Sequence, residues 1–177
     1  MEDSLELAQQ VEVLACTPRT LRALLGDLSP AWTTCDEGPG TFSALDVLGH
    51  LIDGEREDWI PRLRSILSNG PDVTFEPFDR IAFRETLAEV DLDGRLALFD
   101  RLRKENLETL HEMGLTEPDL ERQGMHPEFG LVTAGQLLTS WVVHDLGHIA
   151  QIVRVMSRSQ ADGVGPWREY LPVLTRG

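Results

Sequence analysis

The stretch SWVVHDLGHIAQIV, residues 140–153, places two histidines four residues apart within a largely apolar run. On an α-helix, side chains at i and i+4 are neighbours whose Cβ atoms lie about 5–6 Å apart. His144 and His148 are therefore spaced so that both imidazoles can bind one metal ion. Two ordinary histidines at the edge of a core would show the same spacing, so this stretch alone supports both interpretations equally.

The residues around these histidines have the pattern of a long amphipathic helix. Thr133 and Gln136 form a capping box, and we expect the helix to cover residues 133–159. A projection at 100° per residue places His144 and His148 together at one flank of the apolar face. The centre of that face is predicted from Leu138, Val142, Ile149, Val153 and Met156.

Three further helices are predicted from apolar residues that recur at helical intervals. The first covers residues 18–28, with Thr17 as its N-cap and Pro18 in its first turn, and residues 4–15 also have a helical pattern. The third covers about 93–113.

The second predicted helix covers residues 43–67. Ser43 and Asp46 have the spacing of a capping box at its start. Pro61 lies inside this range and is expected to kink the helix, because proline lacks the backbone N–H of the helical hydrogen bond.

These helices predict an all-α protein, a four-helix bundle with long connecting loops and a single domain over residues 1–177. No strand-like alternation is evident in the sequence. Residues 68–91 form an acidic connection that is long for a compact domain, and a crossover between two parallel helices is one use for it. Residues 165–174 have the pattern of a short C-terminal helix that docks on the bundle.

The composition argues against several classes of function. The formal net charge of −14 disfavours nucleic acid and anionic membrane surfaces as partners. No apolar run approaches the roughly 18 residues of a membrane span, and the acidic N-terminus lacks the pattern of a signal peptide. Cys16 and Cys35 are isolated and are predicted to be free thiols, which suits a cytoplasmic location.

A catalytic metal site of this kind usually takes three protein ligands, so a third ligand is expected on another helix. His50, in VLGHLIDGERE, is the best candidate. It shares a polar strip with Asp46, Asp53 and Glu57, which either faces water or lines a wet cavity. Asp53, Glu57 and, on the third helix, Asn106 are candidate helper residues for catalysis.

Other histidine patterns are weaker. HDLGH resembles the HExxH motif of zinc proteases, but Asp145 stands where the general-base glutamate is required. Glu108 and His111 supply one Glu-x-x-His, whereas di-iron bundles need two. His126, which precedes a proline, is interpreted as a structural loop residue.

Taken together, ALDVLGHLIDGE, HPEFGLVT and HDLGHIAQI resemble the DinB/YfiT-like superfamily over residues 17–175. The resemblance implies a bundle of up-down-down-up topology with one divalent metal ion per chain. Carried over residue by residue, it implies the ligands His50, His144 and His148, while Gln151 matches the family pattern without being a ligand. Imidazole suits several transition metals, of which we favour zinc or nickel.

The resemblance implies a metal-dependent enzyme, either a hydrolase or a thiol-dependent S-transferase. The expected partner is a small-molecule substrate, with a low-molecular-weight thiol as one candidate. Two alternatives stay open, a non-catalytic metal-binding or sensing module and a helical partner-binding domain. Related bundles often pair, and a homodimer is expected here, with aromatic residues of the connecting and terminal segments either covering the bundle or forming an interface: Phe75, Phe78, Phe83, Trp167 and Tyr170.

Overall fold

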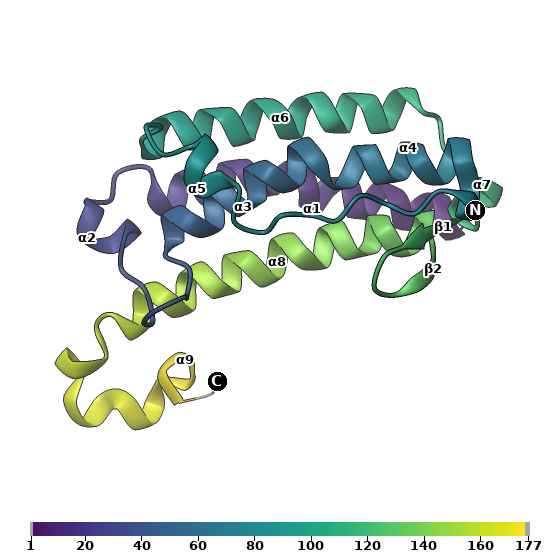
Figure 1. The fold of residues 1–177 in the computed structure, drawn as a ribbon. Coiled ribbons are helices and arrows are strands. Elements are labelled where there is room, and N and C mark those ends of the chain that lie inside the picture. The colour runs from purple at the N-terminus through teal and green to yellow at the C-terminus, as the bar shows by residue number, and fades with distance from the viewer. Residues whose placement is uncertain (1, 176–177) are drawn as a thin grey trace.

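The computed structural model describes residues 2–175 and is built mainly of helices that run side by side (Figure 1). The bundle consists of α1 (Glu2–Leu25), α3 (Ala44–Glu57) continued by α4 (Trp59–Asn69), α6 (Leu92–Glu112) and α8 (Ala134–Arg158). α1 leaves the N-terminal end, α3 and α4 return to it, α6 runs parallel to them, and α8 runs back again. The topology is therefore the up-down-down-up order that the resemblance implies.

The connection between α4 and α6 is the crossover that the long acidic loop predicts. It runs back along the bundle so that α6 can begin at the same end as α3 (Figure 1). The shorter elements are α2 (Pro30–Thr33), η1 (Gly70–Asp72), α5 (Phe83–Thr86), α7 (Glu117–Leu120), β1 (Gln123–His126), β2 (Gly130–Thr133), η2 (Ala161–Gly163), η3 (Gly165–Tyr170) and α9 (Pro172–Thr175).

The first helix starts earlier than predicted, and Thr17 is not its N-cap. α1 is continuous and contains Pro18, which leaves the carbonyl of Leu14 without a helical N–H partner. Arg103 of α6 supplies the missing donor, with its Nη1 2.8 Å from that carbonyl oxygen. The Thr17 hydroxyl donates to the carbonyl of Val13 at 3.2 Å. A tertiary contact thus satisfies what the proline removes, so the helix continues through it.

The second helix is interrupted, as Pro61 predicts, but the break lies at Asp58. This residue has φ −108° and ψ −72° and separates α3 from α4. Proline has no N–H for the carbonyl of Glu57 and its ring clashes with that carbonyl, so the distortion appears one turn before the ring itself. Asp58 also forms an ion pair with Arg62 at 2.7 Å, which holds the new helical start.

The prediction of no significant sheet missed one small feature. β1 and β2 form an antiparallel hairpin in which Gln123 pairs with Thr133 and His126 with Gly130. An isolated parallel bridge joins Thr74 of the crossover to Met125. Strands of four residues are too short to show a clear alternation of apolar and polar residues.

Some of the aromatic residues in the connecting and terminal segments cover the bundle as expected, and others are exposed. Phe75 and Phe83 of the crossover are buried in the core. Trp167 and Tyr170 are 69% and 80% exposed, whereas Leu174 of α9 is buried and docks the C-terminal segment on α8.

Both cysteines are free, as predicted. Among the described helices, none has the length and apolar character needed to cross a lipid bilayer.

Candidate metal centre

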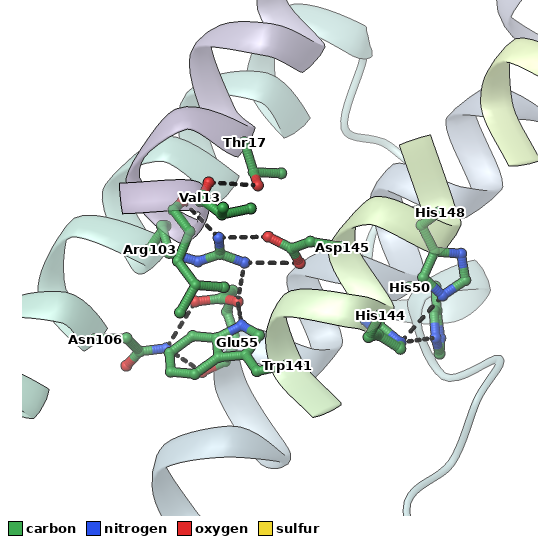
Figure 2. Close-up of polar contacts among 11 residues, drawn as sticks. Val13, Thr17, His50, Glu55, Arg103, Asn106, Trp141, His144, Asp145 and His148 are labelled. Atoms are coloured by element: carbon green, nitrogen blue, oxygen red, sulfur yellow. Dashed lines mark hydrogen bonds and ion pairs between the residues drawn. The ribbon is translucent and has the colours of Figure 1, made fainter. Parts of the chain in front are cut away.

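Three histidines from two helices meet between α3 and α8 (Figure 2). His50 comes from α3, and His144 and His148 come from successive turns of α8. The Nε2 atom of His144 lies 3.2 Å from Nε2 of His50 and 3.0 Å from Nε2 of His148. Among the described side chains that could bind a metal, these three histidines form one group. Their ligand atoms all lie within 4.8 Å of one another. The structure thus brings together the three ligands implied by the resemblance.

The surroundings of His50 differ from a solvated polar face. Its side chain is 7% exposed, because α3 is the central helix of the bundle and is buried over most of its circumference. Of the candidate helpers on the same strip, Asp53 is buried and 3.8 Å from Arg56, and Glu57 is exposed. Asn106 instead donates to Glu55 at 3.0 Å. None of the three candidate helpers joins the histidine cluster.

The predicted centre of the apolar face of α8 was only partly right. Four of its five residues lie in the core or pack against it, and Val153 does not. Val153 is 42% exposed, whereas Trp141 and Asp145 are 1% and 0% exposed. Asp145 lies near the middle of the inner face. A helical projection that treats aspartate as an exposed residue therefore places the centre of the apolar face too far from it. His144 and His148 therefore lie closer to the core than their sequence position suggests.

Burial keeps the imidazoles neutral. It lowers the pKa of His50 to about 4, with the neighbouring His148 contributing in the same direction. It lowers the pKa of His144 to about 3, followed by the effects of His148 and His50. The pKa of His148 is also lowered, again mainly by burial. A metal binds the neutral ring, so this cluster presents ligands that need no deprotonation at neutral pH.

Gln151 determines which nitrogen of His148 is available. Its side-chain oxygen lies 2.8 Å from Nδ1 of His148, so Nδ1 carries the proton and the lone pair of Nε2 points into the cluster. The outer ring nitrogen of a metal-binding histidine usually has a hydrogen-bond partner, and Gln151 is that partner for His148. Among the described residues, the Nδ1 atoms of His50 and His144 are buried and have no such side-chain partner.

A cavity of about 830 Å³ opens onto the three histidines. This volume lies in the range of sites that enclose small molecules. Its wall is mainly aromatic near the cluster, with the His50 ring 5.8 Å from Phe42 and 5.6 Å from Phe78, and the His144 ring 5.1 Å from Trp59. The cluster is thus accessible to a ligand from one side and shielded on the others.

His126 lies in the wall of the same cavity but outside the cluster. Its Nδ1 accepts hydrogen bonds from the backbone N–H groups of Glu128 and Phe129, at 3.1 and 3.2 Å. The ring also stacks on Phe129, with centroids 4.3 Å apart. These contacts hold the β1–β2 turn and agree with the structural role predicted for His126.

Sequence reasoning missed a buried polar cluster beside the histidines (Figure 2). Arg103 of α6 donates to both oxygens of Asp145, at 2.7 and 3.1 Å, and to Glu55 at 2.8 Å. All three side chains are almost fully buried. The sequence does contain one sign of this cluster. Arg103 and Asp145 have opposite charges and both fall on the inner faces of predicted helices.

Comparison with known proteins agrees with this geometry. Residues 14–152 match the family described as the DinB superfamily. The chain belongs to the DinB superfamily. A relative from Oceanobacillus iheyensis, named as a candidate metal-dependent hydrolase, is 25% identical over 142 residues, which is 80% of each chain.

Two solved structures share the fold of this DinB superfamily chain. YfiT from Bacillus subtilis, described as a probable metal-dependent hydrolase with an unusual four-helix bundle topology, has a TM-score of 0.74 and 24% identity over 86% of each chain. TT2238, described as a four-helix bundle protein, has a TM-score of 0.58 and 22% identity over 83% of this chain and 98% of its own. The fold predicted from the sequence is confirmed.

The lowered pKa values predict an unusual pH range for metal binding. Protons compete with the metal only below the pKa values of the metal-free ligands, which for His50 and His144 fall from 6.5 to about 4 and about 3. Since the pKa of His148 is lowered as well, we expect metal to stay bound below pH 6.5, the ordinary pKa of histidine, and to be lost as the pH falls toward 4. Equilibrium dialysis at stepped pH, with circular dichroism to confirm folding, measures this. Loss of metal centred near pH 6.5 in the folded protein would contradict it.

Proposed function

We propose that this chain is a metal-dependent hydrolase of a small molecule, with one divalent ion held by His50, His144 and His148. The observation that carries the proposal is the convergence of three neutral Nε2 atoms on the wall of a cavity of about 830 Å³. Three imidazoles with an open side are the donor set of catalytic zinc sites. Zinc and nickel are the metals we favour.

The chain supplies neutral imidazole ligands, fixes the tautomer of His148 and surrounds the cluster with aromatic side chains. Gln151 orients His148, and the rings of Phe42, Trp59 and Phe78 limit the access of bulk water to the cluster. A divalent ion bound by three imidazoles lowers the pKa of coordinated water to about 7, or stabilises a bound thiol as thiolate. Both nucleophiles are compatible with the site.

The hydrolase proposal is supported by what the relatives are named. Both the Oceanobacillus iheyensis protein and YfiT are described as candidate or probable metal-dependent hydrolases. A thiol-dependent S-transferase that uses a low-molecular-weight thiol is the second candidate, because a thiolate at the same open position would start that reaction. The substrate class in an activity screen distinguishes the two.

The non-catalytic alternative requires a fourth protein ligand, which would close the site. Among the described residues, no further histidine, cysteine or carboxylate joins the group of three. Asp58 lines the same cavity, but its carboxylate is paired with Arg62 at 2.7 Å. The open side therefore favours the enzyme over a closed structural or sensing module.

Metal analysis followed by an activity screen tests the proposed function. We expect about one divalent ion per chain in the purified protein, and turnover of ester, amide or thiol-adduct substrates that a chelator removes and the metal restores. The His144→Ala variant is the matched inactive control. Stoichiometric metal without turnover of any substrate class would favour the non-catalytic module, and absence of metal would refute both.

We also propose that the chain forms a homodimer through the outer face of α8. Val143, Leu146 and Val153 are 61%, 50% and 42% exposed, and Gly147 and Ala150 between them are exposed as well. These five residues carry no charge, and the neighbouring Arg154 is paired with Glu37 at 2.9 Å, so a second copy of this acidic chain can approach the face without strong repulsion.

Light scattering tests the dimer. We expect about twice the chain mass of 19.8 kDa for the parent protein at micromolar concentration. A Val153→Glu variant should give the mass of one chain, because two copies would bury like charges. A single-chain mass for the parent protein would contradict the proposal.

A further inference from the structure

The buried polar cluster behind the histidines contains more negative than positive charge. Glu55 accepts hydrogen bonds from Arg103, from the indole Nε1 of Trp141 at 3.1 Å and from Asn106 at 3.0 Å, and Asp145 accepts two from Arg103. Every one of these partners is a donor, so both carboxylates are bound as anions. One guanidinium and two carboxylates leave a net charge of −1.

This charge is shielded from solvent. The side chains of Arg103 and Glu55 are each 1% exposed and that of Asp145 is 0% exposed. An unbalanced charge in such an environment is costly unless an opposite charge lies nearby. Among the described residues, no ion pair gives either carboxylate a cation other than Arg103.

The two carboxylates belong to the same helices as the proposed metal ligands. Glu55 follows His50 by five residues on α3, and Asp145 lies between His144 and His148 on α8. Figure 2 shows the carboxylate cluster and the histidine cluster on neighbouring sides of α8.

Aromatic packing fills the space between the clusters. Trp141, which donates to Glu55, stacks on Trp59 with ring centroids 5.6 Å apart, and the Trp59 ring meets the edge of His144 at 5.1 Å. An apolar medium of this kind screens a charge much less than water does. The charge of the cluster is therefore less screened toward the histidines than it would be in water.

We propose that the net negative charge of the Arg103, Glu55 and Asp145 cluster is the electrostatic counterpart of the metal ion, and that Glu55 and Asp145 raise metal affinity without coordinating it. This inference rests on the metal site of the proposed function. Three neutral imidazoles around a divalent ion leave two positive charges in a mostly apolar setting. The buried −1 balances part of them, and the ion in turn balances the buried −1.

Neutralising one carboxylate at a time tests the inference. The variants are Asp145→Asn and Glu55→Gln, which keep side-chain shape and leave the cluster neutral. Glu57→Gln is the matched control, because it makes the same chemical change on an exposed residue at the end of α3. Zinc affinity is measured for each folded variant by competition with a chromophoric chelator, and the stability of the metal-free protein by urea unfolding.

We expect both buried variants to bind zinc about 10–100-fold more weakly, the range for changes to groups behind a metal ligand, with Glu57→Gln within about twofold of the parent. Affinity within about twofold of the parent for Asp145→Asn and Glu55→Gln would overturn the inference. A loss of zinc affinity in Asp145→Asn alone would also overturn it, because that result would be explained by displacement of the neighbouring His144 and not by charge. If Asp145→Asn does not fold, Glu55→Gln decides alone. If the parent binds no zinc, the proposed function fails as well, which is a separate result.

Discussion

Replacing His148 with alanine is expected to remove stoichiometric metal from the protein. The substitution takes away one of three Nε2 donors and the one whose tautomer is set by Gln151. Losing a direct ligand should cost more than losing a supporting group, so affinity should fall by more than about 100-fold. The measurement is bound metal per chain after dialysis, together with a chelator competition. The same loss is expected for His50→Ala.

The helical signal should survive these substitutions, because the apolar cores of the bundle lie mainly outside the cluster. His126→Ala is the matched control, since this histidine lines the same cavity but lies outside the group of three. That variant should keep its metal. If the combined alanine variant at His50, His144 and His148 retained one ion per chain, the assignment of these ligands would be refuted.

Replacing Arg103 with methionine is expected to destabilise the fold by about 3–5 kcal/mol, the range for breaking a buried ion pair from one side. The change leaves Glu55 and Asp145 buried without a cation and removes the donor to the Leu14 carbonyl beside Pro18. Since domains are stable by only about 5–15 kcal/mol, this is a large fraction of the total. Urea unfolding of the metal-free protein measures it.

Arg101→Met is the control on the same helix. Arg101 forms an ion pair with Glu105 at 3.3 Å, but the two side chains are 62% and 54% exposed. Exposed pairs contribute about 0–1 kcal/mol, so this variant should unfold near the parent midpoint. Equal loss of stability in the two variants would show that the buried network of Arg103 has no special role.

The capped helices could be predicted closely from the sequence because their signals are local. Ser43 and Asp46 form the predicted capping box at the start of α3, and Thr133 and Gln136 form the one at the start of α8. The continuity of α1 through Pro18 could not be predicted, because the residue that satisfies the Leu14 carbonyl is 89 positions away.

The candidate site was predictable only in part for the same reason. The i, i+4 spacing of His144 and His148 is visible in the sequence, and His50 was the best candidate for a third ligand, but its polar neighbours suggested either a solvated face or a wet cavity. Its burial depends on α3 being surrounded by other helices. The helical projection places Asp145 on an inner face, but the burial of its charge depends on Arg103, 42 positions away.

The chain order of the ligands has a consequence for how the protein is made. His50 precedes His144 by 94 residues, and α8 is the last long helix of the bundle. At about 5–20 residues per second, the ribosome adds His144 roughly 5–20 seconds after His50. During that interval the nascent chain contains only one of the three histidines. Metal acquisition is therefore expected only after α8 has been translated.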